Sequence, residues 1–86
     1  MIKIYSWIDG SVLHKGDFET IKELLEDGVK NGISFNYAKL NDAQLNNAKL
    51  NDAQLNNAKL NDAQLNDAKL NNAELNYAEL NNAQLN

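Results

Sequence analysis

Few residues in this chain have the types and spacing that catalysis requires. His14 is the only histidine, and its nearest candidate partners along the chain are Lys15, Ser6, Ser11 and Asp17. No spacing among them matches a nucleophile, a base and a group that orients the base. We therefore interpret His14 as an ordinary surface histidine and predict that the protein is not an enzyme.

Ligand-binding patterns are equally sparse. The chain has 86 residues and no cysteine, which excludes disulfides and thiolate metal sites, and its four glycines do not form a phosphate-binding loop. Asp42 and Asp62 would form a carboxylate pair if their spacing stacks them. Two such residues fall short of the six to eight oxygens that Ca²⁺ takes, so we interpret them as solvated and predict no metal and no cofactor.

Composition narrows the class of protein further. Twelve acidic residues against eight lysines give a net charge of −4, which argues against a surface for nucleic acid. No apolar stretch approaches the ~18 residues of a membrane span, and the N-terminus lacks the apolar region of a secretory signal. We therefore expect a cytoplasmic protein that binds neither nucleic acid nor a membrane.

The abundance of Asn and Gln has two possible explanations, a disordered polar tract or an ordered repeat. From Ala38 to Asn86, ten alanines and ten leucines recur every five residues without an insertion, and residues 33–37 fit the same template with larger side chains. A disordered tract has no reason to keep that register. We therefore predict an ordered array over residues 33–86, with residues 1–32 as a separate element before it.

The five-residue period indicates a coil built from short strands. On an α-helix each unit would advance by about 140° net, so no apolar stripe would form. In an extended segment, Ala and Leu two positions apart share one face, and the Asn and the residue after it favour a turn. Four units then close into a square coil of ~20 residues, and such coils stack through parallel hydrogen bonding. In that stack the Asn side chains, for example those of Asn41, Asn61 and Asn81, are expected to form amide ladders.

The Ala-x-Leu-x-x array resembles the pentapeptide-repeat family. This resemblance implies an all-β solenoid, a right-handed quadrilateral parallel β-helix, here of about 2.7 coils. It implies that Leu40, Leu45 and their equivalents, with Phe35, occupy the central inward position and that Ala38, Ala43 and their equivalents occupy the small inward position. The family usually places Asp or Asn between these two positions, whereas this sequence has Lys, Gln or Glu there and places Asn after Leu.

Residues 1–32 are predicted to form an N-terminal cap. Two alternating segments around Asp9-Gly10 predict a β-hairpin, and Asp17 is the expected N-cap of an amphipathic helix that runs up to Gly32. The arrangement also resembles the leader of small bacterial and phage-encoded pentapeptide-repeat proteins. We expect the helix to cover the open first coil, with contacts from Phe18, Ile21, Leu24, Leu25, Val29, Ile33 and Phe35.

The last coil has no such cap in the sequence, so we expect it to expose strand edges and leucines. Our hypothesis is a two-fold homodimer joined end to end, with a frayed monomer end as the alternative. The predicted interface comprises Leu70, Leu75, Tyr77, Leu80, Leu85 and Asn86.

The preferred function is a non-enzymatic structural or protein-interaction solenoid that self-associates, with an unidentified protein as a possible further partner. The hairpin, the helix and the corner from Tyr37 to Tyr77 are the expected surfaces for such a partner. The resemblance raises one alternative, because some family members imitate duplex DNA and inhibit type II topoisomerases such as DNA gyrase. An array ~13 Å tall would match DNA carrying about eight negative charges, but residues 33–86 hold six acids and four lysines.

Overall fold

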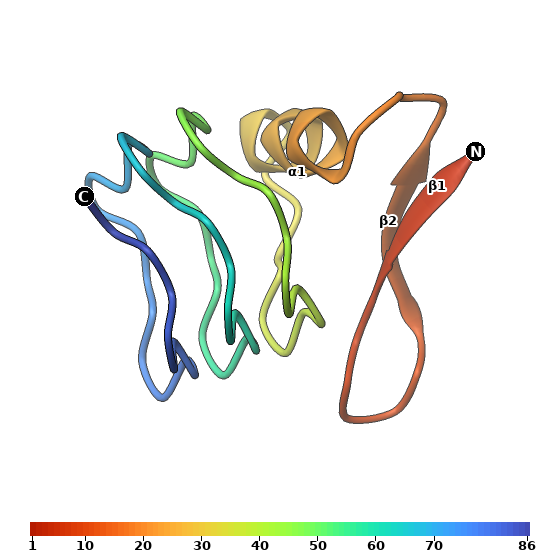
Figure 1. Cartoon of the computed structure of the whole chain (residues 1–86). Helices are drawn as coiled ribbons and strands as arrows, with labels where there is room; N and C mark the ends of the chain where they lie inside the picture. Colours follow the sequence, from red (N-terminus) through yellow and green to blue (C-terminus); the bar gives the residue numbers. More distant parts are fainter.

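The computed structural model describes the whole chain, residues 1–86. Strands β1 (Ile2–Tyr5) and β2 (Val12–Gly16) form a hairpin, helix α1 (Ile21–Lys30) follows, and the remaining chain winds into stacked coils. The hairpin and the helix lie at one end of the stack, and the C-terminus lies at the other end (Figure 1). The repeat region is therefore a β-helix solenoid. The helix is neither long enough nor apolar enough to cross a membrane.

Neighbouring coils are held together by parallel pairing of residues that lie 20 positions apart, as the sequence predicts. The N–H of Lys59 donates to the Ala38 carbonyl at 2.9 Å, and the N–H of Leu40 donates to the Lys59 carbonyl at 2.8 Å. The same pattern recurs at five further pairs of outward-facing residues. The bridged pairs are Lys39 with Lys59, Gln44 with Gln64, Lys49 with Lys69, Gln54 with Glu74, Lys59 with Glu79, and Gln64 with Gln84.

Each five-residue unit ends in a tight β-turn. In the turn after Leu40, the N–H of Ala43 donates to the Leu40 carbonyl at 3.1 Å, and Asp42 has a φ of 65°. Positive φ only at the third turn residue is the signature of a type II turn. The left-handed residue is thus the one after Asn and not Asn itself. The residues in this conformation are Tyr37, Asp42, Asn47, Asp52, Asn57, Asp62, Asp67, Asn72, Tyr77 and Asn82.

The Ala and Leu side chains of the first two coils are mostly buried and form the core. In the middle of the stack, Leu45, Leu50 and Leu55 are at most 1% exposed. This burial weakens toward the C-terminal end, where the side chain of Leu85 is 53% exposed. The core therefore reaches the solvent at that end of the molecule.

The hairpin differs from the predicted one in its connection. β1 ends at Tyr5, so the chain between the strands is longer than the two-residue turn expected at Asp9-Gly10. The Asp9 carboxylate accepts hydrogen bonds from the Ser11 N–H at 3.0 Å and from the Ser11 hydroxyl at 2.8 Å. These bonds stabilise the charged form and lower the pKa of Asp9.

The residues after β1 also pair with the first coil. Ser6 forms an antiparallel bridge with Ala38, and the N–H of Lys39 donates to the Tyr5 carbonyl at 2.8 Å. The sequence predicted that residues 1–32 form a cap and that the helix covers the first coil. In the structure, residues 5–7 also cover one edge of that coil as an added strand.

Helix α1 begins later than predicted. Its N-cap is Thr20, whose hydroxyl oxygen accepts from the Glu23 N–H at 3.1 Å, and the prediction of Asp17 was wrong. Thr20 and Glu23 have the spacing of a capping box, and the Glu23 carboxylate accepts from the Thr20 hydroxyl at 3.1 Å. Asp17 lacks a helix to cap and lies 3.7 Å from the N-terminal ammonium. Phe18 consequently precedes the helix.

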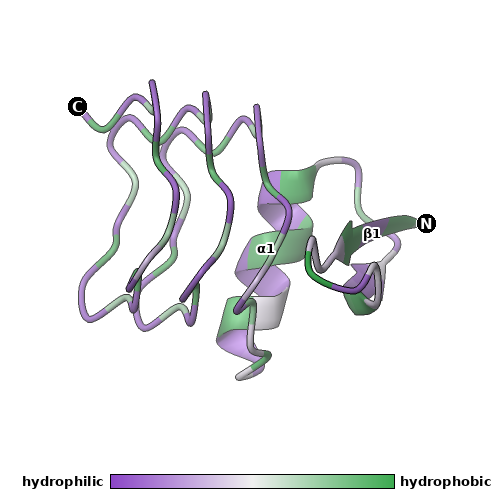
Figure 2. Ribbon diagram, turned by 90° about the horizontal axis from the view of Figure 1, so that it is seen from below, coloured by the Kyte–Doolittle hydropathy of each residue, from purple (hydrophilic) through white to green (hydrophobic).

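The helix lies across the end of the coil stack and packs on Phe35 (Figures 1 and 2). Leu24, Leu25 and Phe35 are fully buried. Gly28 allows the close approach, because a Cβ at this position would overlap the Phe35 ring. The other predicted cap residues, Phe18, Ile21, Val29 and Ile33, are half-buried against the same core.

We predict that Gly28→Ala destabilises the protein by about 1–3 kcal/mol, because the new methyl group must displace the Phe35 ring. Helix propensity alone favours Ala over Gly by ~1 kcal/mol, so the two effects have opposite signs. Urea unfolding measures the difference. In a Phe35→Leu background the same substitution should cost less, and a more stable Gly28→Ala protein would contradict the packing.

Candidate functional site

His14 joins the hairpin to the helix. Its Nε2 lies 2.9 Å from Oδ2 of Asp27, its side chain is 17% exposed, and its ring meets Phe35 edge-on with centroids 6.0 Å apart. The prediction of an ordinary surface histidine was therefore wrong. Ser6, one of the hydroxyls considered near it, is buried and accepts from the Ile8 N–H at 3.2 Å. These contacts give His14 a structural role.

The exposed acidic corners do not gather into a metal centre. Asp42 and Asp62 lie at equivalent left-handed corners of successive coils and are both exposed. No group of three or more His, Asp or Glu side chains is arranged to hold a metal ion.

The asparagine ladders connect side chains to backbone. Oδ1 of Asn41 accepts from the Asn61 N–H at 3.0 Å, and Oδ1 of Asn61 accepts from the Asn81 N–H at 3.0 Å. The predicted ladders between side-chain amides are therefore wrong: each Asn side chain bonds to the backbone of the next coil. The same bond joins Asn36 to Asn56, Asn46 to Asn66, Asn51 to Asn71, Asn56 to Asn76, and Asn66 to Asn86.

In four of these asparagines, the side-chain nitrogen also donates to an outward-facing side chain. Nδ2 of Asn61 donates to Oε1 of Glu79 at 3.0 Å, and Nδ2 of Asn66 donates to Oε1 of Gln84 at 3.1 Å. Many of the polar groups on the outer faces are therefore committed to bonds within the stack. We conclude that the ends of the stack are better candidates for a functional site than its sides.

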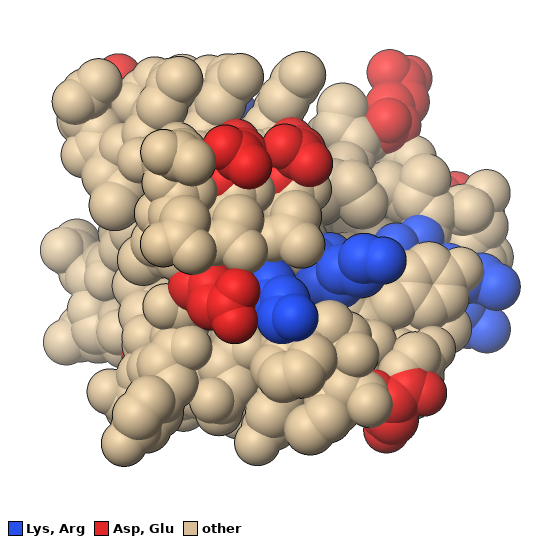
Figure 3. All heavy atoms as spheres, turned by 60° about the horizontal axis from the view of Figure 1, so that its bottom comes forward, with Lys and Arg blue, Asp and Glu red and all other residues tan.

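At the N-terminal end, Trp7 anchors the hairpin to the coils. Its Nε1 donates to the Asn57 carbonyl at 2.6 Å, its ring lies 5.8 Å from that of Tyr37, and the Lys59 ammonium lies 4.2 Å from its ring centroid. The last contact is a cation–π interaction. Figure 3 shows lysine side chains gathered on this face with acidic side chains around them. This cluster was not predicted from the sequence, in which Trp7 alternates with Lys3 and Tyr5 on the side opposite to Ile2 and Ile4.

The C-terminal end is an open edge. The N–H groups of Leu70, Leu75, Leu80 and Leu85 donate to no acceptor, whereas the N–H of Leu65 donates to the Gln84 carbonyl at 2.7 Å. Leu70, Leu75 and Leu80 are half-buried and Tyr77 is 87% exposed. Asn86 is tied to the preceding coil, because its N–H donates to Oδ1 of Asn66. Eight leucines from Leu50 to Leu85 line an apolar cavity of about 80 Å³.

We predict that Asn61→Ala destabilises the protein by about 1–2 kcal/mol, because it removes the acceptor for the Asn81 N–H and the donor to Glu79. Asn71→Ala is the matched control, since the Asn71 side chain makes no hydrogen bond in the structure and should cost less than about 0.5 kcal/mol. Chemical denaturation compares the two. Equal losses would mean that turn propensity, and not the ladder, determines the effect.

Comparison with known proteins identifies the repeat. A family model described as pentapeptide repeats matches residues 48–86 in eight copies. Searches of curated proteins and of solved structures find no match to this chain. The coils continue without interruption before the matched range, because Lys39 and Gln44 pair with Lys59 and Gln64 inside it. The chain thus carries pentapeptide repeats over residues 48–86.

Proposed function

We propose that this protein is a non-enzymatic interaction solenoid that self-associates through its C-terminal coil as a two-fold homodimer. In this proposal the array is a right-handed quadrilateral β-helix of about 2.7 coils, from 54 residues at 20 per coil. Pentapeptide-repeat proteins often serve in protein interaction, which supports the general class. The observation that carries the proposal is the exposure of Leu85, at 53%, against 4% for Leu65 one coil earlier.

Two kinds of group at this end gain from a partner. In a dimer, the half-buried leucines would bury their remaining apolar surface against the partner. Fully burying one Leu side chain stabilises a protein by about 1.5–3 kcal/mol relative to leaving it exposed. The carbonyls of Ala68, Ala73, Ala78 and Ala83 accept no hydrogen bond, and they stand beside the unpaired N–H groups of the last leucines. A two-fold axis presents the same donors and acceptors from both copies, so the edges can satisfy one another.

The backbone conformation and the exposure of Tyr77 also support a dimer interface at the C-terminal coil. It holds a φ of 62°, a conformation that is unfavourable for a bulky residue, and its side chain is 87% exposed. Tyr37, at the equivalent corner nearer the N-terminus, has a similar φ of 69° but packs against Trp7. Contact with a second copy would give Tyr77 the packing that Tyr37 obtains within the chain.

The outer faces favour this proposal over imitation of DNA. One column runs from Lys39 through Lys59 to Glu79, so it carries two positive charges and one negative charge. A second column pairs Lys49 with Lys69. Because duplex DNA carries one negative charge per ~1.7 Å, these columns make a poor substitute, and we do not extend the proposal to inhibition of a topoisomerase.

We predict that Leu85→Lys converts the dimer to monomer while changing the stability of the monomer by less than about 1 kcal/mol, because the side chain is already half exposed. Val12→Lys is the matched control, since Val12 is 44% exposed at the opposite end and should leave the dimer intact. Sedimentation equilibrium over a range of concentrations measures both. A wild-type chain that stays monomeric at millimolar concentration would refute the self-association.

We predict that Tyr77→Asn raises monomer stability by about 0.5–1 kcal/mol, because Asn tolerates left-handed φ, and that it weakens dimerisation. Unfolding in the Leu85→Lys background gives the first quantity, and the dimer dissociation constant of the single variant gives the second. Asp67→Asn, at another left-handed corner, serves as the control. Unchanged dimerisation in Tyr77→Asn would place this side chain outside the interface.

A further inference from the structure

The N-terminal cap leaves one side of the first coil uncovered. Among the six inward alanines from Ala38 to Ala63, five are buried and only Ala43 is not. On one side of this gap, Tyr5 accepts the N–H of Lys39. On the other side, Oε2 of Glu26 accepts the N–H of Lys49 at 2.7 Å. The hairpin and the helix therefore supply the acceptors that a preceding coil would supply, at Lys39 and at Lys49. The segment between these two residues has no such partner.

The open segment presents a complete set of backbone groups for another strand. The N–H and carbonyl groups of Asn41, Gln44 and Asn46 form no hydrogen bond in the structure. One coil later, the equivalent groups of Gln64 are both paired, with the Ala43 carbonyl at 2.9 Å and the Leu45 N–H at 2.7 Å. An occupant needs only to present the carbonyl of one residue and the N–H of the residue two positions later to satisfy Gln44 in the same way.

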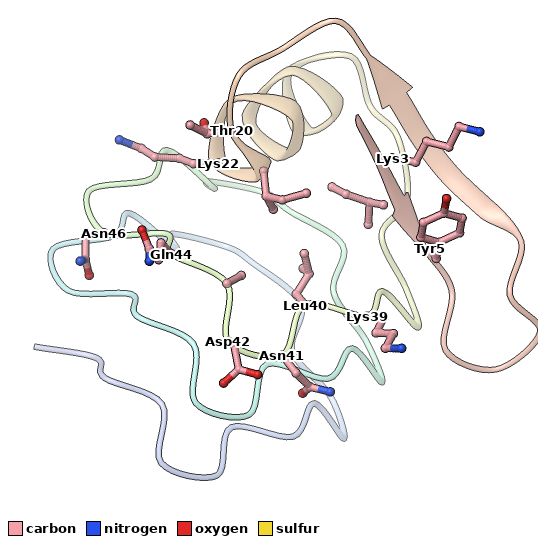
Figure 4. A pocket seen from close by; sticks show the side chains of 13 residues that line it. Lys3, Tyr5, Thr20, Lys22, Lys39, Leu40, Asn41, Asp42, Gln44 and Asn46 are labelled. Atoms are coloured by element: carbon pink, nitrogen blue, oxygen red, sulfur yellow. The ribbon is translucent and has the colours of Figure 1, made fainter. Parts of the chain in front are cut away.

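A pocket of about 650 Å³ lies directly over this segment, between the hairpin, the helix and the coil (Figure 4). Its apolar wall includes Ile4, Ile21, Leu40 and Ala43. Its polar lining includes three lysines, Lys3, Lys22 and Lys39, against one acid, Asp42. Figure 4 shows Lys22 at the end nearest Gln44 and Asn46, Lys3 and Lys39 on the hairpin side, and Asp42 on the side away from the helix.

We propose that this segment, residues 41–46, binds an extended peptide of a partner protein as an added strand, and that the peptide alternates apolar and acidic residues. The apolar positions face Ala43, Ile4 and Ile21, and the carboxylates face Lys22 and Lys39. Main-chain hydrogen bonds at a strand edge supply the affinity, and alternate side chains supply the specificity. The excess of lysines in the lining determines the charge of the peptide.

The shape of the cap restricts the occupant to a single strand. The last coil of a second copy carries the right backbone groups, but its adjoining sides would occupy the space already filled by residues 5–7 and by α1. The inference goes beyond the proposed self-association, because it uses the opposite end of the stack. A monomeric variant should therefore keep this site.

The test uses a capped peptide, acetyl-Glu-Ala-Glu-Leu-Glu-amide, titrated into the full-length ¹⁵N-labelled chain. We expect saturable shifts of the Asn41, Gln44 and Asn46 amide signals and slower hydrogen exchange at Gln44. N-methylation of the peptide Leu removes the donor to the Gln44 carbonyl and should weaken binding about tenfold, as should Lys22→Glu combined with Lys39→Glu. The matched control, Lys15→Glu with Lys69→Glu, alters two exposed lysines outside the pocket and should leave the affinity within about twofold.

Three outcomes would overturn the proposal. The first is no saturable shift at Gln44 with millimolar peptide. The second is equal binding by the N-methylated peptide, which would indicate attraction between charges without strand addition. The third is a response confined to Leu70, Leu75, Leu80 and Leu85, which would place the peptide at the C-terminal edge. Binding that persists in Leu85→Lys separates this site from the dimer interface, so either proposal can fail without the other.

Discussion

The structure depends on hydrogen bonds between successive coils. Each strand has only about three residues, too few to be stable alone, and each closes its bonds with the residues 20 positions away. At each corner that is followed by another coil, Asn contributes a second bond, from its Oδ1 to that coil. The type II turn makes this geometry possible, because its left-handed residue turns the chain and the Asn before it keeps its side chain free for the neighbouring coil.

A stack held together in this way has its unsatisfied groups at its two ends. At the N-terminal end, the Tyr5 carbonyl and the Glu26 carboxylate take the places of a preceding coil, and Phe35 fills the space beneath the helix. At the C-terminal end, no group takes the place of a following coil, so the leucine N–H groups and the alanine carbonyls have no hydrogen-bond partner. The same constraint that forms the fold thus leaves two edges of unpaired backbone, one with an apolar layer and one surrounded by lysines.

Much of this architecture is predictable from the sequence, because ten Ala and ten Leu in register allow one inward pattern and one period. The docking of the cap is not predictable in the same way. Tyr5 pairs with Lys39, and His14 contacts Asp27. Both contacts depend on how the hairpin is placed against the first coil and the helix, and residues 1–32 have no periodic pattern that would predict this placement. The helix start is a different case, since the Thr20-x-x-Glu23 capping box is visible in the sequence and indicates the observed N-cap.

Hydrogen exchange at single residues distinguishes the two edges of the stack, because the unpaired backbone N–H groups belong to particular residues. Exchange is followed at low and at high protein concentration. The account predicts that the amides of Leu70, Leu75 and Leu80 exchange fast in dilute solution and become protected as the concentration rises, while Gln44 remains unprotected in both. Fast exchange of these leucine amides at every concentration, or strong protection of them in the isolated monomer, would contradict it.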